Sequence, residues 1–188
     1  MIQEFQQLLK KIAEILDRLE IPYAITGGYA VSVWGRVRST NDVDVLIQLF
    51  EPKINQLYSE LLKISELSYL DKQTMQEEVR RGGQFNFIHG DSGIKFDFYV
   101  AGDTPIHKLE LKRRIHVDVA GQKVYFLAPE DLILSKLRWY KESRSDKQME
   151  DIESVIARQK ELDLDYIREQ AIKQSSIVIF EELLKRKS

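Results

Sequence analysis

The feature that most constrains the fold is a short apolar segment followed by a glycine pair and then by an acidic strand. The run from Tyr23 to Thr26 is predicted to be a buried strand, and Gly27-Gly28 is predicted to turn the chain into a helix. The next strand carries Asp42 and Asp44, one residue apart. Because successive strand side chains point to opposite faces, both aspartates project from one face. The opposite, core-facing side is formed by Val43, Val45 and Ile47.

A third aspartate lies in a second strand-like run. Asp97 is inside the alternating segment from Ile94 to Val100. Three carboxylates on adjacent strands would repel one another unless a cation neutralised them. Hard oxygen ligands of this kind suit Mg²⁺, which is typically held by one or two carboxylates together with substrate phosphates. This pattern predicts an enzyme that acts on a nucleotide.

The bulk composition excludes several classes of protein. The 188 residues suffice for one hydrophobic core or a core with a small appendage. The chain has no cysteine, which excludes disulfides, thiolate zinc sites and cysteine nucleophiles. A net charge of −2 argues against broad electrostatic binding to nucleic acid. No apolar run approaches the roughly 18–20 residues that span a bilayer, and the amino terminus does not resemble a signal peptide, so we expect a cytoplasmic protein.

The remaining patterns predict an α+β fold with a helical C-terminal portion. Apolar residues at steps of three and four predict a helix over residues 2–19, and Pro52 marks the start of another. Two hairpins are expected, one over residues 85–100 and one over residues 115–127. From Pro129 the chain is expected to be helical almost to its end. We therefore divide it into a mixed core, residues 1–127, and a helical portion, residues 128–188, packed on that core.

The glycine pair and the neighbouring cations suggest how a phosphate would be bound. Glycine lets the backbone approach a ligand closely, and N–H groups at the start of the following helix can bind phosphate. Arg36 and Arg38 lie just before the aspartates, where a guanidinium can clamp phosphate oxygens. Each of these features has a structural explanation by itself, as a turn or a solvated loop, and only their combination with the three aspartates favours a site.

These motifs, taken in order, resemble a known family. The segments Gly27-Gly28-Tyr29-Ala30-Val31 and Arg38-Ser39-Thr40-Asn41-Asp42-Val43-Asp44-Val45 resemble the signature of the DNA polymerase β-like nucleotidyltransferase superfamily. In that family a Gly-Ser or Gly-Gly turn precedes an Asp-x-Asp pair, and a third Asp follows on a neighbouring strand. Lys95-Phe96-Asp97 matches the third position. The resemblance implies a nucleotidyltransferase-like mixed β-sheet flanked by helices.

Two later segments resemble the AbiEii-type branch, which includes toxins of toxin–antitoxin systems. They are Leu127 to Leu137, and Arg144-Ser145-Asp146-Lys147 followed by Asp151-Ile152. The chain departs from the family pattern in two places. Gly28 stands where many members carry serine, so a hydroxyl that would contact phosphate is missing. The spacing between Asp146 and Asp151 is looser than usual, which weakens a role for Asp146.

The resemblance implies a metal-dependent enzyme that transfers NMP from an NTP, such as ATP, to an acceptor hydroxyl. The cofactor would be two Mg²⁺ ions, with Mn²⁺ as a substitute. The candidate catalytic and metal-binding residues are Asp42, Asp44 and Asp97. The candidate nucleotide-binding residues are Gly27, Gly28, Arg38, Thr40 and Lys136. For Lys136 a lysine that reaches solvent from an apolar helix face is the alternative.

The acceptor and the protein partners stay open. RNA, a protein and a small molecule are all candidate acceptors, and an antitoxin protein is a candidate partner. The alternatives are a small-molecule nucleotidyltransferase of the antibiotic-modifying type and an inactive binding module of the same fold. If RNA is the acceptor, the basic stretch Lys112-Arg113-Arg114 would form one wall of its cleft.

Three further residue groups are interpreted as structural. Trp139 and Tyr140 are expected to be core residues rather than a stacking surface for a base. Asp131 follows Pro129-Glu130 and is expected to match the dipole of a helix start. His89, His107 and His116 show no metal-ligand spacing.

Overall fold

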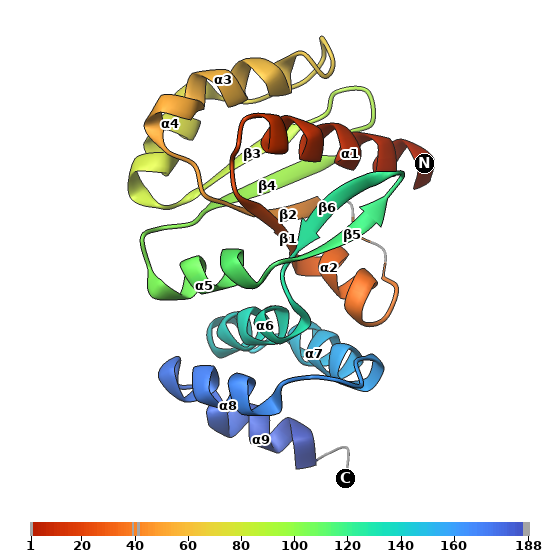
Figure 1. Ribbon diagram of the computed structural model, residues 1–188, viewed down its shortest axis with the longest axis vertical. Coiled ribbons are helices and arrows are strands. Elements are labelled where there is room, and N and C mark those ends of the chain that lie inside the picture. The colour runs from red at the N-terminus through yellow and green to blue at the C-terminus, as the bar shows by residue number, and fades with distance from the viewer. Residues whose placement is uncertain (1, 39, 41, 186–188) are drawn as a thin grey trace.

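A computed structural model describes residues 2–38, 40 and 42–185, and within them the chain forms one mixed six-stranded sheet (Figure 1). The strand order is β3-β4-β2-β1-β6-β5. The pairs β1–β2, β3–β4 and β5–β6 are antiparallel, whereas β1–β6 and β2–β4 are parallel. The strands are β1 (Tyr23–Thr26), β2 (Asp42–Ile47), β3 (Gln84–Ile88), β4 (Lys95–Val100), β5 (Ile115–Val119) and β6 (Gln122–Phe126).

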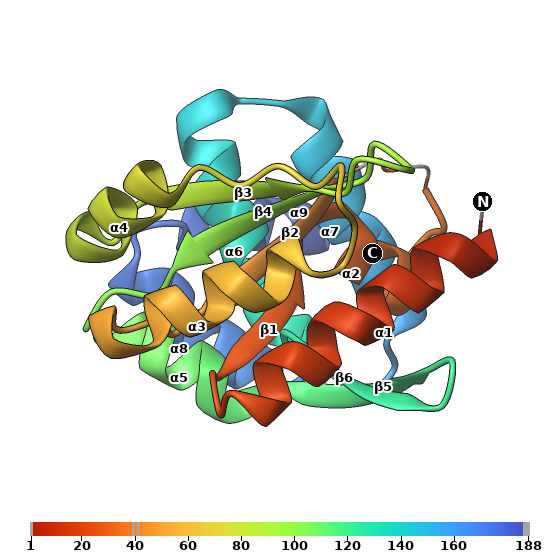
Figure 2. The same cartoon turned by 90° about the horizontal axis from the view of Figure 1, so that it is seen from above.

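Helices cover both faces of the sheet. One face carries α1 (Ile2–Arg18), α3 (Glu51–Leu62) and α4 (Lys72–Arg81), as Figures 1 and 2 show. On the other face, α2 (Gly27–Trp34) packs against β1 and β2 and also against the C-terminal helices. The remaining helices are α5 (Pro105–Arg113), α6 (Pro129–Ser143), α7 (Asp146–Arg158), α8 (Leu164–Lys173) and α9 (Ile177–Lys185). None of the described helices is long and apolar enough to cross a membrane.

The parallel pairing of β2 with β4 places the aspartates. Asp44 is in register with Asp97, and Asp42 with Lys95. The alternation predicted for β2 is confirmed, because the side chains facing the α1–α3 layer, Val43, Val45 and Ile47, are fully buried. The acidic face of the two strands therefore lies toward α2 and α6, in the space between the sheet and the C-terminal helices.

Local patterns predicted most of the elements correctly. The first helix, both hairpins and the helices after Pro129 are confirmed, and Gly27 and Gly28 are the first two residues of α2. Helix α5 was not predicted, although it begins with a clear signal: the Thr104 hydroxyl accepts a hydrogen bond from the His107 N–H, and Pro105 follows the cap. Ser39 and Asn41 of the family motif lie outside the described residues. The domain boundary after Leu127 stays a prediction.

Candidate active site

The three predicted carboxylates share one face of β2 and β4, and a lysine partly neutralises them. Lys95 Nζ lies 2.8 Å from Oδ2 of Asp97 and 3.9 Å from Oδ2 of Asp42. Asp97 is buried, whereas the Asp42 side chain is about half exposed. Within the described part of the chain, no group of three or more His, Asp or Glu side chains is disposed to hold a metal ion. The assignment of all three aspartates as ligands stays a prediction.

Asp44 is held at the junction of the sheet and α2. The Tyr99 hydroxyl donates to Asp44 Oδ1 over 3.2 Å, and the Gly28 N–H donates to the same carboxylate. Burial raises the pKa of Asp44, the bond from Tyr99 opposes that shift, and the charge of Asp97 adds to it. Asp44 is therefore a desolvated carboxylate beside a second one, so bringing a cation close to it is favourable.

Close contacts constrain both glycines, Gly27 far more strongly than Gly28. Gly27 has a φ of +60°, and a Cβ at this position would lie 1.7 Å from Asp44 Oδ2. A Cβ on Gly28 would lie 3.1 Å from the guanidinium carbon of Arg38. The pair therefore lets the first turn of α2 lie directly against the carboxylate and the guanidinium.

The two predicted phosphate-binding cations meet at a buried aspartate. Arg38 Nη1 lies 2.7 Å and Lys136 Nζ 3.0 Å from Oδ2 of Asp151, which is fully buried in α7. Arg36 approaches the other oxygen, Oδ1, at 3.6 Å. Lys136 is only 7% exposed, so the interpretation as a solvent-reaching lysine is wrong. Its burial lowers the pKa of Lys136, and the attraction of Asp151 opposes that shift.

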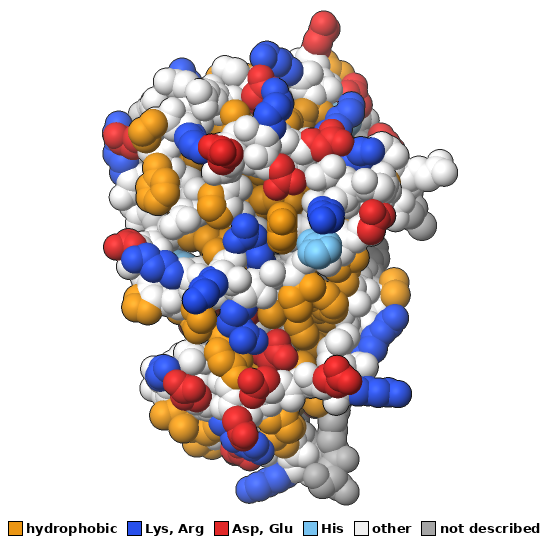
Figure 3. Space-filling model, in the orientation of Figure 1, with side chains coloured by type: hydrophobic (Ala, Val, Ile, Leu, Met, Phe, Trp, Pro, Cys, Tyr) orange, Lys and Arg blue, Asp and Glu red, His pale blue; other side chains and the backbone are white. Residues whose placement is uncertain are grey.

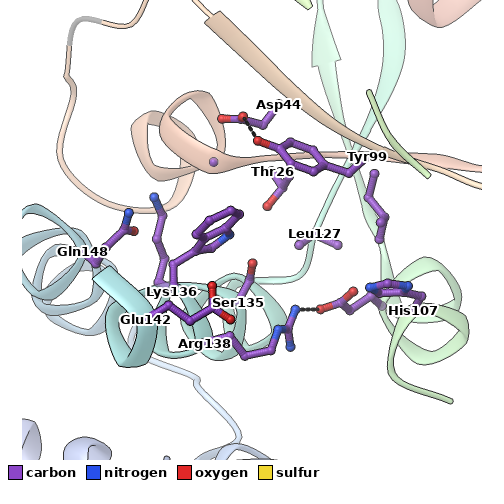
Figure 4. A pocket seen from close by; sticks show the side chains of 14 residues that line it. Thr26, Asp44, Tyr99, His107, Leu127, Ser135, Lys136, Arg138, Glu142 and Gln148 are labelled. Carbon is purple, nitrogen blue, oxygen red and sulfur yellow. Dashed lines mark hydrogen bonds and ion pairs between the residues drawn. The ribbon is translucent and has the colours of Figure 1, made fainter. Parts of the chain in front are cut away.

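A cleft of about 540 Å³ opens beside Asp44. Figure 4 shows Lys136 and Gln148 on one side of it, His107 and Arg138 on the other, and Asp44 with Tyr99 between them. Of the predicted site residues, Gly27, Asp44 and Lys136 line the cleft. Asp42, Asp97, Gly28, Arg38 and Thr40 are not among its lining residues. The Thr40 hydroxyl donates to the main-chain oxygen of Asp42 over 2.9 Å, and its role as a nucleotide ligand stays a prediction.

Several residues of the cleft were missed at the level of the sequence. Tyr99 lies two residues after Asp97 on the same strand face, so the strand period alone could have placed it there. Glu110 of α5 accepts a 2.5 Å ion-pair contact from Arg138 of α6. No local pattern relates these two residues, because their helices meet only in the folded chain. Trp139 is 47% exposed and lines the cleft, so its interpretation as a core residue is wrong.

The basic stretch 112–114 was predicted to border the cleft, but none of its three residues is among those that line it. Arg113 contacts Asp131 at 3.0 Å and Glu130 at 3.3 Å, and its guanidinium stacks 3.8 Å from the centre of the Tyr166 ring. Arg114 lies over the ring of Tyr125. Asp131 is therefore the buried partner of an ion pair in addition to lying in the first turn of α6. Arg113 thus ties α5 to the C-terminal helices and Arg114 packs on β6, and the expectation that the two arginines form a free wall for RNA is wrong.

Residues 5–186 match the family described as nucleotidyl transferase of unknown function (DUF2204). The chain belongs to this nucleotidyl transferase family. No curated protein sequence matches it. The prediction of a nucleotidyltransferase is thus confirmed, whereas the assignment to the AbiEii-type toxin branch is not.

Solved structures agree with this family assignment. An antigenic nucleotidyltransferase-like protein from Paracoccidioides brasiliensis is 25% identical, with a TM-score of 0.56 over 82% of this chain and 74% of that one. The antibiotic-resistance factor ANT(2'')-Ia is 17% identical, with a TM-score of 0.63 over 99% of this chain and 100% of that one. The lincosamide antibiotic adenylyltransferase LnuA is 12% identical, with a TM-score of 0.56 over 81% and 97%. The last two show the fold, and the predicted nucleotidyltransferase-like mixed sheet is confirmed.

Proposed function

We propose that this nucleotidyl transferase moves an NMP group from a nucleoside triphosphate, such as ATP, to a hydroxyl of an acceptor bound in the cleft. The observation that carries the proposal is the register of Asp44 with Asp97, beside a helix start that only glycine permits. The acceptor oxygen would bond to the α-phosphorus, the bond from that phosphorus to the β-phosphate oxygen would break, and pyrophosphate would leave. The acceptor proton would pass to the Asp44–Asp97 pair.

The residues present fit a divalent cation. Asp44 is a buried carboxylate whose pKa is raised partly by its acidic neighbour, and Mg²⁺ is commonly held by one or two carboxylates with substrate phosphates supplying the other oxygens. Asp44 and Asp97 would hold it, with Asp42 at the exposed end of the same face, and Mn²⁺ has the same ligand chemistry. When bound, the metal would supply charge stabilisation for the attacking and leaving oxygens. We propose that two such ions bind at these carboxylates.

The chain itself would bind and orient the triphosphate. Gly27 at the start of α2, Asp44 and Lys136 all line the cleft, so main-chain N–H groups of the first turn of α2 and the ammonium of Lys136 would bind the phosphates. Arg38 and Asp151 lie behind Lys136 and fix its position, so we place Arg38 as a positioning residue for the phosphate site. Thr40 contacts the main chain of Asp42 and would act in the same indirect way.

A small molecule is the acceptor that the cleft favours over RNA. Its lining includes the acidic residues Glu110 and Glu142 and the aromatic Trp139, and Arg113 of the basic stretch is used in internal ion pairs. Two similar solved proteins are described as an antibiotic-resistance factor and an antibiotic adenylyltransferase. Membership of the toxin branch, with an RNA or protein acceptor and an antitoxin partner, is the second candidate and rests on the motif resemblance at residues 127–152.

The experiment that tests the proposal is replacement of Asp44. Asp44→Asn removes an anionic ligand, so ATP with Mg²⁺ should no longer stabilise the protein. At one hundred times its Kd, the nucleotide should raise the wild-type free energy of unfolding by about 2.7 kcal/mol. The apo variant should stay folded, because a desolvated carboxylate has been removed. Thermal melts with and without Mg²⁺-ATP, together with calorimetry, give the comparison.

Asp165→Asn is the matched control, since Asp165 is 98% exposed on α8 and contacts only Arg168 among the ion pairs of the described chain. Wild-type affinity for Mg²⁺-ATP in Asp44→Asn would contradict the assignment. Binding without pyrophosphate release for every acceptor fraction tried would favour the inactive binding module instead.

A further inference from the structure

The two tryptophans of the chain have opposite environments. Trp34 is half-buried, donates its indole N–H to the Leu127 carbonyl over 2.8 Å, and packs edge-on to Phe126. Trp139 is 47% exposed, and its indole N–H donates to no group in the described residues. An indole is large and apolar, so folding normally removes most of it from water. Trp139 is therefore an aromatic face that the folded chain leaves open.

This open face lies inside the cleft, next to the proposed phosphate site. Trp139 follows Lys136 by three residues on α6, so the two side chains lie on the same side of the helix. Both line the cleft. The Trp139 ring centre lies 6.5 Å from that of Tyr99 at an interplanar angle of 71°, and Tyr99 is the residue that hydrogen-bonds Asp44. The aromatic pair thus borders both the carboxylate and the ammonium.

Phosphates alone would not fill this space. A cleft of about 540 Å³ has the size of sites that hold whole small ligands. If the triphosphate lies between Gly27 and Lys136, the nucleoside must extend along the cleft, and Trp139 is the next surface along α6. The lining also includes the ion pair of Glu110 with Arg138, in which the Arg138 guanidinium is already held by the Glu110 carboxylate, so Trp139 is the uncommitted aromatic surface.

We propose that Trp139, supported by its ring contact with Tyr99, is the surface on which the nucleobase of the substrate stacks. The inference rests on the proposed function and adds a specificity-determining residue to it. Every base has a π-face, so stacking accepts all four bases and favours purines only through their larger area. Discrimination at this site is then set by ring area rather than by hydrogen bonds to base edges.

The test compares a nucleotide with a ligand that has phosphates but no base. Trp139→Leu keeps an apolar side chain and removes the π-face. Calorimetry in the presence of Mg²⁺ should show a loss of ATP affinity of about fivefold to a hundredfold, the range expected for one stacked base. The affinity for inorganic tripolyphosphate should be unchanged. Trp139→Phe should recover part of the loss, whereas Phe50→Leu, at an aromatic side chain 63% exposed outside the cleft, should have no effect.

A second measurement reports on the indole directly. In Trp34→Phe protein the only fluorescent indole is Trp139, because the chain has two tryptophans. Mg²⁺-ATP should quench its emission, and Mg²⁺-tripolyphosphate should bind without quenching. If Trp34→Phe does not fold, the calorimetric comparison still decides, since it uses only Trp139 variants.

Three outcomes overturn the inference, and one of them separates it from the proposed function. Equal losses for ATP and tripolyphosphate in Trp139→Leu would show a disturbed phosphate site, not stacking. Unchanged ATP affinity with slower turnover would place the acceptor, not the base, on Trp139. If the wild-type protein bound neither ATP nor tripolyphosphate with Mg²⁺, the proposed function itself would fail.

Discussion

Gly27 shows how a single residue can be fixed by two independent constraints. Its φ of +60° lies in the left-handed region, which costs an L-residue about 1 kcal/mol or more. Its missing side chain also leaves the space that Asp44 Oδ2 occupies. A glycine required only for its dihedral angle would tolerate an added methyl group at a modest cost in stability. A methyl group at Gly27 would instead displace the Asp44 carboxylate, which we place in the active site.

Gly93 provides the comparison that separates these two constraints. It has a φ of +69°, but a Cβ there would meet no atom within 4 Å. We expect Gly93→Ala to lower the free energy of unfolding by about 1 kcal/mol and to leave Mg²⁺-ATP affinity unchanged. Gly27→Ala should lower stability further and abolish nucleotide binding, because Asp44 must move. Urea unfolding and calorimetry on both variants measure the two effects, and equal nucleotide affinity in the two would contradict the role of the contact.

At the scale of elements, the junction of α6, α7 and the loop before β2 is an ion-pair cluster around Asp151. Arg38 and Lys136 neutralise one buried carboxylate, and both come from segments more than ten residues away from it in the sequence. Removing one member of a buried ion pair leaves the other charges desolvated, which is usually much more costly than losing an exposed pair.

Asp151→Ala should therefore lower the free energy of unfolding by about 3–5 kcal/mol. Glu150 is the adjacent control, because its pair with Arg36 at 2.6 Å is exposed on both sides. Glu150→Ala should cost about 0–1 kcal/mol. Chemical denaturation of the two variants tests the difference, and similar losses would show that the Asp151 cluster is not the main link between α7 and the catalytic face.

The elements also show which parts of the fold and of the site local sequence patterns could predict. Strands such as Asp42–Ile47 carry their alternation within six residues, and the helices after Pro129 carry theirs within each turn, so local patterns sufficed. The strand patterns and the family motif together predicted that Asp97 lies on a strand next to Asp44, but the register that pairs the two residues is not contained in either strand's own alternation. The partnership of Asp151 with Lys136, and the position of Trp139 in a cleft wall, depend on how helices meet, and a helical period does not distinguish a core face from a cleft face.

At the scale of the whole molecule, the net charge is small and the face shown in Figure 3 carries charges of both signs. The net charge is −2, and Lys and Arg side chains are interspersed with Asp and Glu on the face shown in Figure 3. A protein that binds an RNA backbone through many contacts needs a cationic surface, and its affinity falls steeply with salt. This distribution agrees better with a small acceptor than with RNA.

We therefore expect weak RNA binding with little salt dependence. Between 50 and 200 mM salt the affinity for a labelled RNA should change by less than about tenfold, compared with about 10³–10⁵ for proteins making six to ten phosphate contacts. Fluorescence anisotropy of a labelled RNA across this range measures it. A steep decline would restore RNA as the acceptor. The control is the same salt series on Lys112→Ala, because Lys112 is the exposed member of the basic stretch.

The parallel pairing of β2 with β4 has a consequence for the order in which the molecule assembles. A hairpin can form from neighbouring residues, but a parallel pair needs a long crossover, and here α3, α4 and β3 all lie between the two strands. Such non-local contacts cost loop-closure entropy before they give any stabilisation, so they slow folding. The carboxylate pair therefore forms only once β2 and β4 have paired across this crossover, and a newly made molecule would gain nucleotide affinity only after that step.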